Sequence, residues 1–244
     1  MVYEELKNKF EDLSDEDKNA LLIYKSRLGR AINSLDIEEK EVVEVYNKYK
    51  RLLSNPANMF MSFTVFKDVS FSSLDSFKES LINVKNKVLN INLTLDEDTT
   101  VYRAFSLSDD SEEELLSKSE LISTSLDIDT CDDFLVAGNK RHYLYQINLK
   151  KGSKVAICPY AILLDSKSDR LILSKSHDQE EILLNKENYS FDIVKTTTKE
   201  LDNNEKLVIR VYVKDGVTEL GNAPWGATNA TVKYYNATTG EEVK

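Results

Sequence analysis

Three polar features in the second half of the sequence could take part in chemistry. Arg103 lies in an apolar stretch, Ser123-Thr124-Ser125 closes another, and Gln179 and Glu181 stand one residue apart ahead of a third. A guanidinium can grip phosphate oxygens with two donors, hydroxyls can hydrogen-bond sugars or carboxylates, and a carboxylate can stabilise developing positive charge. Each feature alone also fits a structural role without chemistry: an arginine on an edge strand, a serine-rich strand end or a solvated loop.

The geometry of a β-strand would determine which way the side chains of Gln179, Glu180 and Glu181 point. Polar residues from His177 run directly into the apolar segment that begins at Ile182. If the strand includes Gln179, side chains alternate, so Gln179 and Glu181 share one face and Glu180 points the other way. We therefore expect a carboxamide and a carboxylate side by side at a strand mouth, with Glu180 in a structural or solvated role.

Helices are expected over residues 1–90, which would pack beside these strands. Ser14 and Asp17 resemble a capping box, Gly29 is a possible break, and Asn55-Pro56 should end a helix. A loop rich in Phe and Met is expected next, and Ser72 and Ser73 are possible caps of a further helix. Apolar residues recur every three or four positions before and after that loop, which is typical of a helix face packed on a core, at Leu21, Tyr24, Leu28, Ile32, Leu35, Val42, Val45, Tyr49, Leu52, Leu74, Phe77, Leu81, Val84 and Val88.

Short β-branched segments separated by polar turns follow from Asp96 onward. Short helices are expected from Ser111 and around 129–137, and residues 216–244 are a polar tail, a hairpin over 231–244 or the start of a further β element. The expected strands lie near 99–105, 119–125, 143–149, 153–158, 169–174, 180–185, 189–196 and 206–213. Helices first and strands second indicate an α+β fold. We expect one domain over 1–215, with a helical lobe over about 1–95 and a β-rich core over about 96–215.

Composition narrows the possible functions. The chain has 244 residues and a formal net charge of −10, which disfavours an extended nucleic-acid surface. Two cysteines, Cys131 and Cys158, are too few for a disulfide scaffold and lack zinc-ligand spacing. The two histidines, His142 and His177, are read as non-catalytic, and no metal is expected. There is no apolar run long enough for a membrane span and no signal-peptide layout at the start, so we expect a soluble monomer in a reducing cytosol.

In this order and on this layout, the three features resemble the Arg, Ser-Thr-Ser, Gln/Glu-x-Glu signature of mono-ADP-ribosyltransferases of the bacterial exoenzyme type. Three further stretches are similar to that family: the early helix from Ala20 through Asn33, the strand and Lys-Gly turn over Tyr145–Lys154, and Glu181–Lys186. The resemblance covers roughly residues 14–213. It implies the ADP-ribosyltransferase fold, in which N-terminal helices pack on a mixed, mainly antiparallel two-sheet β core.

The resemblance also implies roles for single residues, with NAD as the substrate and no metal. Glu181 would stabilise the positive charge that develops on ribose when nicotinamide leaves, and Arg103 would bind NAD. Ser123 would hydrogen-bond Glu181 or the nicotinamide ribose. Thr124 and Ser125 belong to the same NAD-binding motif and would maintain the strand geometry. The family's loop after its hydroxyl motif contacts NAD through an aromatic residue and an arginine, for which the candidates are Phe134 and Arg141, although Phe134 could equally be a core residue.

The residue two before the glutamate helps choose the acceptor in this family, and Gln179 resembles the exoenzymes that modify Asn or Gln of a small GTPase. A carboxamide can pair with another carboxamide in both directions, whereas a guanidinium prefers a carboxylate. We therefore expect transfer of ADP-ribose to Asn or Gln of a target protein. Guanine in nucleic acid, water (an NAD glycohydrolase) and a catalytically inactive binding module of the same fold remain alternatives.

One segment departs from the Rho-modifying exoenzymes. The stretch from Cys158 to Asp178 is longer than their target-recognition loop and its approach, and Leu173–Asp178 lacks the aromatic residue that those enzymes use against their target. A different protein target is therefore open. A toxin that acts in the cytosol of a foreign cell and a phage or bacterial effector would share these features, and the delivery route is not specified by the sequence.

Overall fold

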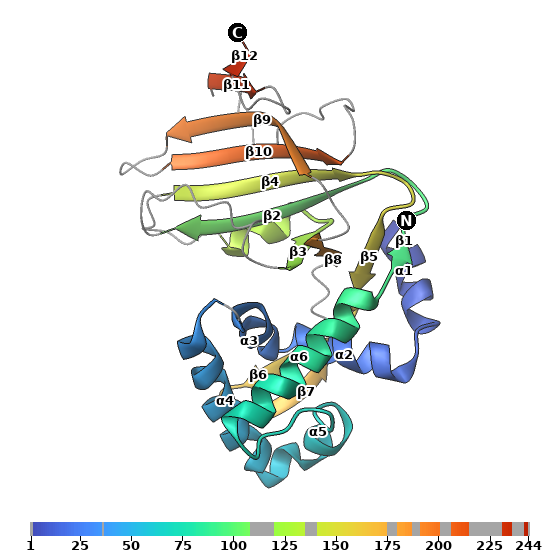
Figure 1. The fold of residues 1–244 in the computed structure, drawn as a ribbon, viewed down its shortest axis with the longest axis vertical. Helices are drawn as coiled ribbons and strands as arrows, with labels where there is room; N and C mark the ends of the chain where they lie inside the picture. Colours follow the sequence, from blue (N-terminus) through green and yellow to red (C-terminus); the bar gives the residue numbers. More distant parts are fainter. Residues whose placement is uncertain are drawn as a thin grey trace.

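The computed structural model describes residues 2–35, 37–107, 120–134, 141–174, 180–186, 191–200, 206–214, 231–235 and 242–243, and beyond residue 186 it describes the backbone alone. Helices occupy the first part of the chain and form the lower half of Figure 1. Their bounds are α1 Val2–Glu11, α2 Asp15–Lys25, α3 Leu28–Ser34, α4 Glu39–Ser54, the 3-10 helix η1 Pro56–Asn58, α5 Met59–Thr64 and α6 Leu74–Asn90. No described helix is long and apolar enough to cross a membrane.

The helix boundaries expected from the sequence are largely confirmed. The Ser14 side chain caps α2 by accepting a hydrogen bond from the backbone N–H of Asp17, and Ser73 caps α6 in the same way. The α4 helix ends one residue before Asn55, and Pro56 starts η1, where its missing N–H costs nothing. Short polar side chains and one proline therefore set these ends.

Three helical expectations need correction or stay open. The Phe- and Met-rich stretch is not a loop, because Met59–Thr64 forms α5 directly after η1. The helix expected around 129–137 is a 3-10 helix, η3, over Asp129–Phe134, and residues 135–137 lie outside the described residues. The helix expected from Ser111 also lies outside the described residues.

Strands follow the helices, which confirms the α+β class. Their bounds are β1 Leu93–Thr94, β2 Thr99–Leu107, β3 Leu121–Ser125, β4 Arg141–Leu149, β5 Lys154–Ile157, β6 Ala161–Asp165, β7 Arg170–Ser174, β8 Glu181–Asn185, β9 Phe191–Glu200, β10 Lys206–Lys214, β11 Thr231–Tyr235 and β12 Glu242–Val243. The described strands form a ten-stranded sheet in the order β1-β5-β8-β3-β2-β4-β10-β9-β11-β12 and a two-stranded sheet, β6-β7. Pairing is antiparallel except between β4 and β10, so the core is mixed and mainly antiparallel, as expected.

The large sheet has a weak seam between β2 and β3. These two strands share a single residue pair, Tyr102 with Ser125, whereas β2 and β4 stay paired from Thr99 to Leu107. Figure 1 shows the consequence: β3, β5 and β8 lie between the helices and the upper strands β2, β4, β10 and β9, and β5 runs across their direction. The seam leaves room for side chains of both halves to face one space.

One continuous set of buried side chains joins the helices to the strands nearest them. It runs from Leu21 of α2 and Leu81 of α6 to Ile122 of β3 and Ile182 and Leu184 of β8, and each of these side chains is at most 1% exposed. Burial of this apolar surface fixes β3 and β8 against the helical lobe. The expected division of the chain into domains stays a prediction.

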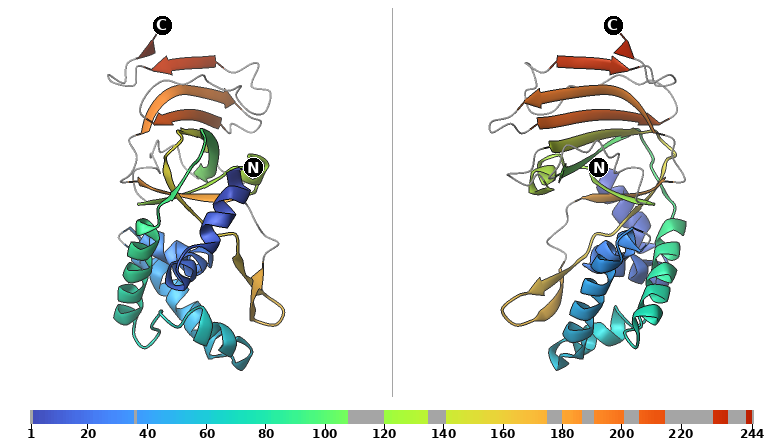
Figure 2. Two further views of the ribbon diagram at one scale, coloured as in Figure 1. Left: turned by 90° about the vertical axis from the view of Figure 1, so that its right-hand side faces the viewer. Right: turned by 60° about the vertical axis from the view of Figure 1, so that its left-hand side comes forward.

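The long segment before Glu181 contains a β-hairpin. Strand β6 was not expected, and it pairs antiparallel with β7. The hairpin is attached to the helical lobe through Asn58, whose fully buried amide donates to the Asp169 carbonyl at 2.8 Å and accepts from the Leu171 N–H at 2.8 Å. Figure 2 shows the hairpin as an arm beside the helices, separate from the large sheet.

The end of the chain extends the sheet. Strand β11 pairs antiparallel with β9, and β12 pairs antiparallel with β11, with Tyr234 opposite Val243. This is the hairpin alternative for residues 231–244, placed on the edge of the core. Strand β1 was likewise not expected, and it pairs with β5 through Leu93 and Val155.

Candidate active site

A cleft of about 610 Å³ opens where the C-terminal end of α2, helix α3, the β2–β3 seam, η3 and β8 meet. This volume falls in the range of about 300–1,000 Å³ that is usual for small-molecule sites. Its lining residues carry charged groups, hydroxyls, aromatic rings, an amide and a thiol, and a few are small or aliphatic. They are Tyr24, Lys25, Ser26, Arg27, Gly29, Arg30, Asn33, Tyr102, Arg103, Ala104, Phe105, Ser123, Thr124, Ser125, Thr130, Cys131, Phe134, Ile162 and Glu181.

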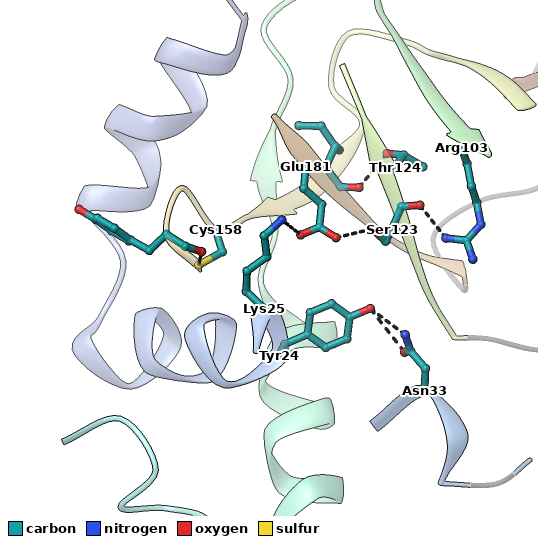
Figure 3. Close-up of polar contacts among 10 residues, drawn as sticks. Tyr24, Lys25, Asn33, Arg103, Ser123, Thr124, Cys158 and Glu181 are labelled. Atoms are coloured by element: carbon teal, nitrogen blue, oxygen red, sulfur yellow. Dashed lines mark hydrogen bonds and ion pairs between the residues drawn. The ribbon is translucent and has the colours of Figure 1, made fainter. Parts of the chain in front are cut away.

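Glu181 is the first residue of β8 and faces this cleft. It pairs with Ser125 across β3 and β8, so Ser123, two residues back, lies diagonally across on the same face. The Ser123 hydroxyl donates to Oε1 of Glu181, and the Lys25 ammonium donates to Oε2 at 2.5 Å (Figure 3). Each carboxylate oxygen therefore has one donor, and the contact between Ser123 and Glu181 is one of the two that the sequence led us to expect.

Arg103 enters the cleft from β2. One terminal nitrogen, Nη1, donates to the Ser123 carbonyl at 2.6 Å, which ties the arginine to the strand that carries the hydroxyls. Burial lowers the pKa of the Arg103 guanidinium from its usual value, although the group remains charged because an arginine does not lose its proton in proteins. Its Nε–H is buried without a hydrogen-bond partner among the described residues, so it can still donate to a ligand.

The backbone conformation of Glu180 does not fit the regular strand that was expected to include Gln179, Glu180 and Glu181. Strand β8 begins at Glu181, and Glu180 has φ = 46°, in the left-handed region that a non-glycine residue seldom adopts. Strand alternation therefore does not run through Glu180, and the expected strand over 180–185 starts one residue late. Gln179 lies outside the described residues, so its shared face with Glu181 stays a prediction.

The two remaining hydroxyls of the motif contact backbone groups. Thr124 lies on the opposite face of β3, where its hydroxyl donates to the Ile182 carbonyl at 2.7 Å. The Ser125 hydroxyl accepts from the Asp127 N–H at 3.0 Å in the turn after the strand. The Thr124 contact joins β3 to β8 and the Ser125 contact fixes the turn that follows β3, which fits the role in strand geometry expected for these residues.

Phe134 and Arg141 are the two residues expected to contact NAD from the loop after the hydroxyl motif. Phe134 is the last residue of η3 and lines the cleft, and its side chain is 49% exposed, so it is not a core residue. Arg141 begins β4, where its backbone lies opposite Leu107, but its side chain lies outside the described residues. Whether either residue contacts NAD stays a prediction.

The α2 and α3 helices contribute a hydrogen-bonded pair at the floor of the cleft. The Tyr24 hydroxyl lies 3.0 Å from Nδ2 of Asn33, which donates to it (Figure 3). Burial raises the pKa of Tyr24 above its ordinary value, and the negative charge of Glu181 raises this pKa further. Tyr24 is therefore a neutral donor and acceptor here. These two residues belong to the early-helix stretch that resembled the exoenzymes.

Cations outnumber carboxylates in the described lining of the cleft, although the chain as a whole is acidic. Four positive side chains, Lys25, Arg27, Arg30 and Arg103, accompany one carboxylate, Glu181. The sequence did not single out the first three: Lys25 is in the last turn of α2, where a cation is the usual complement of the helix dipole, and Arg27 and Arg30 are exposed cations at the start of α3. The expected break was placed at Gly29, but α2 ends at Lys25 and α3 begins at Leu28, so the break lies at Ser26 and Arg27 and Gly29 is the second residue of α3. This junction brings Lys25, Arg27 and Arg30 together.

The described residues contain no group of three His, Cys, Asp or Glu side chains that could hold a metal ion. Cys131 lines the cleft and Cys158 lies outside it, and both are buried thiols that form no disulfide with the described residues. The described part of the cleft offers a carboxylate, hydroxyls, an amide, a thiol, aromatic rings and cations.

No family model and no curated protein matches this chain at a significant level. Among solved structures it is similar to C3larvin toxin, an ADP-ribosyltransferase from Paenibacillus larvae, with a TM-score of 0.31 and 13% identity over 74% of this chain and 88% of that one. It is also similar to exoenzyme S from Pseudomonas aeruginosa, in complex with human 14-3-3 protein beta and bound to carba-NAD (TM-score 0.35, 12% identity, 88% of this chain and 96% of that one).

A third similar structure is a mutant of the eukaryotic mono-ADP-ribosyltransferase ART2.2 in complex with NAD, with a TM-score of 0.33 and 12% identity over 91% of this chain and 79% of that one. The TM-scores and identities are all low. These superpositions therefore add nothing to what the residues of the cleft support.

Proposed function

We propose that this protein is a mono-ADP-ribosyltransferase that cleaves NAD, with Glu181 as its catalytic carboxylate, and transfers ADP-ribose to Asn or Gln of a target protein. The observation that carries the proposal is the Glu181 carboxylate, held by the Ser123 hydroxyl at the β2–β3 seam, in a cleft whose other described charges are all positive. A dinucleotide needs both features: cations for its diphosphate and a carboxylate near its ribose.

The proposed reaction starts with cleavage of the bond between nicotinamide and ribose. The electron pair of this bond moves to the ring nitrogen of nicotinamide, and the positive charge moves to C1′ of ribose. Glu181 stabilises that charge and accepts a hydrogen bond from a ribose hydroxyl. The amide nitrogen of the acceptor then bonds to C1′ and gives up one proton.

The remaining groups of the cleft have roles that follow from their chemistry. Arg103 donates to the diphosphate or ribose through the N–H groups that Ser123 does not occupy. Ser123 orients Glu181. The exposed ring of Phe134 offers a surface for a planar nicotinamide or adenine ring. Gln179 is the basis for an amide acceptor, because two carboxamides can each donate to and accept from the other.

Glu181→Gln tests this proposal because glutamine keeps the shape of the side chain and removes its charge. Nicotinamide release from NAD should fall by about 100–1,000-fold, the usual cost of losing one group that stabilises transition-state charge. Glu180→Gln is the matched control, one residue away, and should leave release near the wild-type rate. Equal release by wild type and Glu181→Gln would contradict the proposal.

The acceptor requires a separate measurement. Labelled NAD is incubated with bacterial lysate, animal lysate, DNA and RNA, and each modified product is digested and fragmented to locate the adduct. An adduct on Asn or Gln of a protein is the expected result. An adduct on Arg or on guanine would overturn the choice of acceptor, and nicotinamide release without any adduct would indicate an NAD glycohydrolase.

A further inference from the structure

The ion pair between Lys25 and Glu181 connects the helical lobe to the β core across 156 positions of sequence. The side chains are only 10% and 13% exposed, so solvent and salt screen their attraction weakly. Glu181 is the one acidic partner of Lys25 in the part of the chain that the structure describes. Figure 3 shows the ammonium directed at the carboxylate from the side opposite Ser123.

Hydrogen bonds at the end of α2 hold the backbone around Lys25. Lys25 is the last residue of α2, and Ser26 caps this end: its N–H bonds to the Leu22 and Ile23 carbonyls, and its hydroxyl donates to the Ile23 carbonyl at 2.6 Å. The Gly29 N–H in turn donates to the Ser26 carbonyl at 3.0 Å. The four-carbon stem of lysine can still swing its ammonium between partners without moving this backbone.

This ion pair conflicts with the reaction proposed for Glu181. Ser123 donates to Oε1 and the Lys25 ammonium donates to Oε2 at 2.5 Å, so the ammonium takes up one acceptor position of the carboxylate and offsets its negative charge. A positive charge at that place would also oppose the positive charge that develops on C1′. The arrangement seen here therefore holds Glu181 in a form that is poorly suited to catalysis.

We propose that Lys25 restrains Glu181 electrostatically and that the anionic diphosphate of NAD draws the ammonium away when the dinucleotide binds. The inference rests on the proposed function and adds a regulating residue to it. Arg27, Arg30 and Arg103 line the same cleft, so a diphosphate bound among them lies within the field of these cations and attracts a fourth. Release of Glu181 is then coupled to occupancy of the cleft.

The test separates the charge of Lys25 from its shape. Lys25→Met removes both charge and donor, Lys25→Gln keeps a donor, and Lys25→Arg keeps the charge. In single-turnover release from nicotinamide riboside, which has no diphosphate to draw the ammonium away, the Met and Gln variants should have rate constants about tenfold higher than the wild type, as expected for a unit charge near a reacting centre. At saturating NAD their rate constants should match the wild type, and their Kd for NAD should be weakened by about threefold because one cation is lost. The Arg variant should stay near wild type.

Lys18→Met is the matched control. Lys18 lies on the same helix and pairs with Glu11 at the surface, so its loss should leave both constants unchanged. If Lys25→Met does not fold, because Glu181 then keeps a partly desolvated charge, Lys25→Gln still decides the question. A rate constant that falls in the Gln variant would overturn the restraint and make Lys25 a positioning residue for the carboxylate.

Failure of the restraint and failure of the proposed function give different results. If wild type releases nicotinamide and Glu181→Gln does not, but the Lys25 variants are no faster with nicotinamide riboside, only the restraint is wrong. If wild type shows no release that depends on Glu181, the proposed function is wrong, and the restraint is overturned with it because it has no reaction to limit.

Discussion

The strands of the β core and the junction of helices α2 and α3 contribute different kinds of group to one cleft. Arg103, Ser123 and Glu181 come from strands and are tied to one another by hydrogen bonds. Arg27 and Arg30 come from the helix junction and are exposed. The strands therefore hold the groups that can carry chemistry, whereas the helices supply charge that can attract and seat an anion. Lys25 links the two sets through its ion pair with Glu181.

Apart from Glu181→Gln, the largest loss of activity is expected from a substitution on the strand side of the cleft, at Arg103. In Arg103→Lys a single ammonium replaces a planar group that bonds the Ser123 carbonyl and has further donors left for a ligand. We expect kcat/KM for nicotinamide release to fall by roughly 10–100-fold. Arg51→Lys, an exposed change on α4, is the control. Equal kcat/KM values for the two variants would place Arg103 outside the proposed machinery.

A smaller effect is expected where the two helices meet. A Cβ on Gly29 would lie 2.2 Å from the Tyr24 carbonyl oxygen, so Gly29→Ala must displace the end of α2. We expect the free energy of unfolding to fall by about 1–3 kcal/mol, together with weaker NAD binding. Denaturant titration and a binding isotherm measure the two effects.

Gly152→Ala is the matched change in the β core. Gly152 has φ = 84° and nothing within 4 Å of an added Cβ, so the cost is conformational, about 1–2 kcal/mol, and lies in the Lys-Gly turn outside the cleft. It should lower stability and leave NAD binding intact. Loss of binding in this variant as well would show that the cleft responds to global stability and not to the helix junction.

The smallest effect should come from the exposed cations. The double variant Arg27→Gln, Arg30→Gln should weaken the Kd for NAD by a few-fold, flatten its dependence on salt and leave the rate constant at saturation unchanged, because exposed charges are screened. Titrations at several salt concentrations measure this, with Arg51→Gln as control. A drop in the saturated rate constant would mean that the helix side also takes part in the chemical step.

The sequence predicted the elements whose ends are set locally. Ser14, Ser73 and Pro56 mark helix boundaries through bonds to neighbouring residues, so they can be recognised without knowledge of the rest of the fold. The hairpin strand β6 was missed because a short apolar run beside Pro159 can be read as a loop. The α5 helix was missed because its exposed aromatic residues, such as Phe60 and Phe63, do not form a buried helical face.

The part of the candidate site that lies on neighbouring strands could be predicted from the sequence. The part contributed by the helices could not. Ser123 and Glu181 meet because neighbouring strands place them diagonally, which the sequence could indicate once both strands were assigned. The partner of Glu181 on the other oxygen comes from a helix far away in sequence, and nothing local distinguishes Lys25 from a surface lysine. Glu180, which has the left-handed conformation, likewise has a partner far away in sequence: the Leu126 N–H donates to its carbonyl at 3.1 Å.

Asn58 has an effect that resembles a non-covalent cross-link. Without it, the chain between Ile157 of β5 and Glu181 of β8 would close one long loop, but its two hydrogen bonds fix Asp169 and Leu171 to the helical lobe. The loop that still has to close runs only from Ser174 to Glu181. Because loop-closure entropy grows with the logarithm of length, this shortening reduces the entropic cost of holding Glu181 in place by on the order of 1 kcal/mol. A long segment between β5 and β8 is thus compatible with a well-placed Glu181 carboxylate.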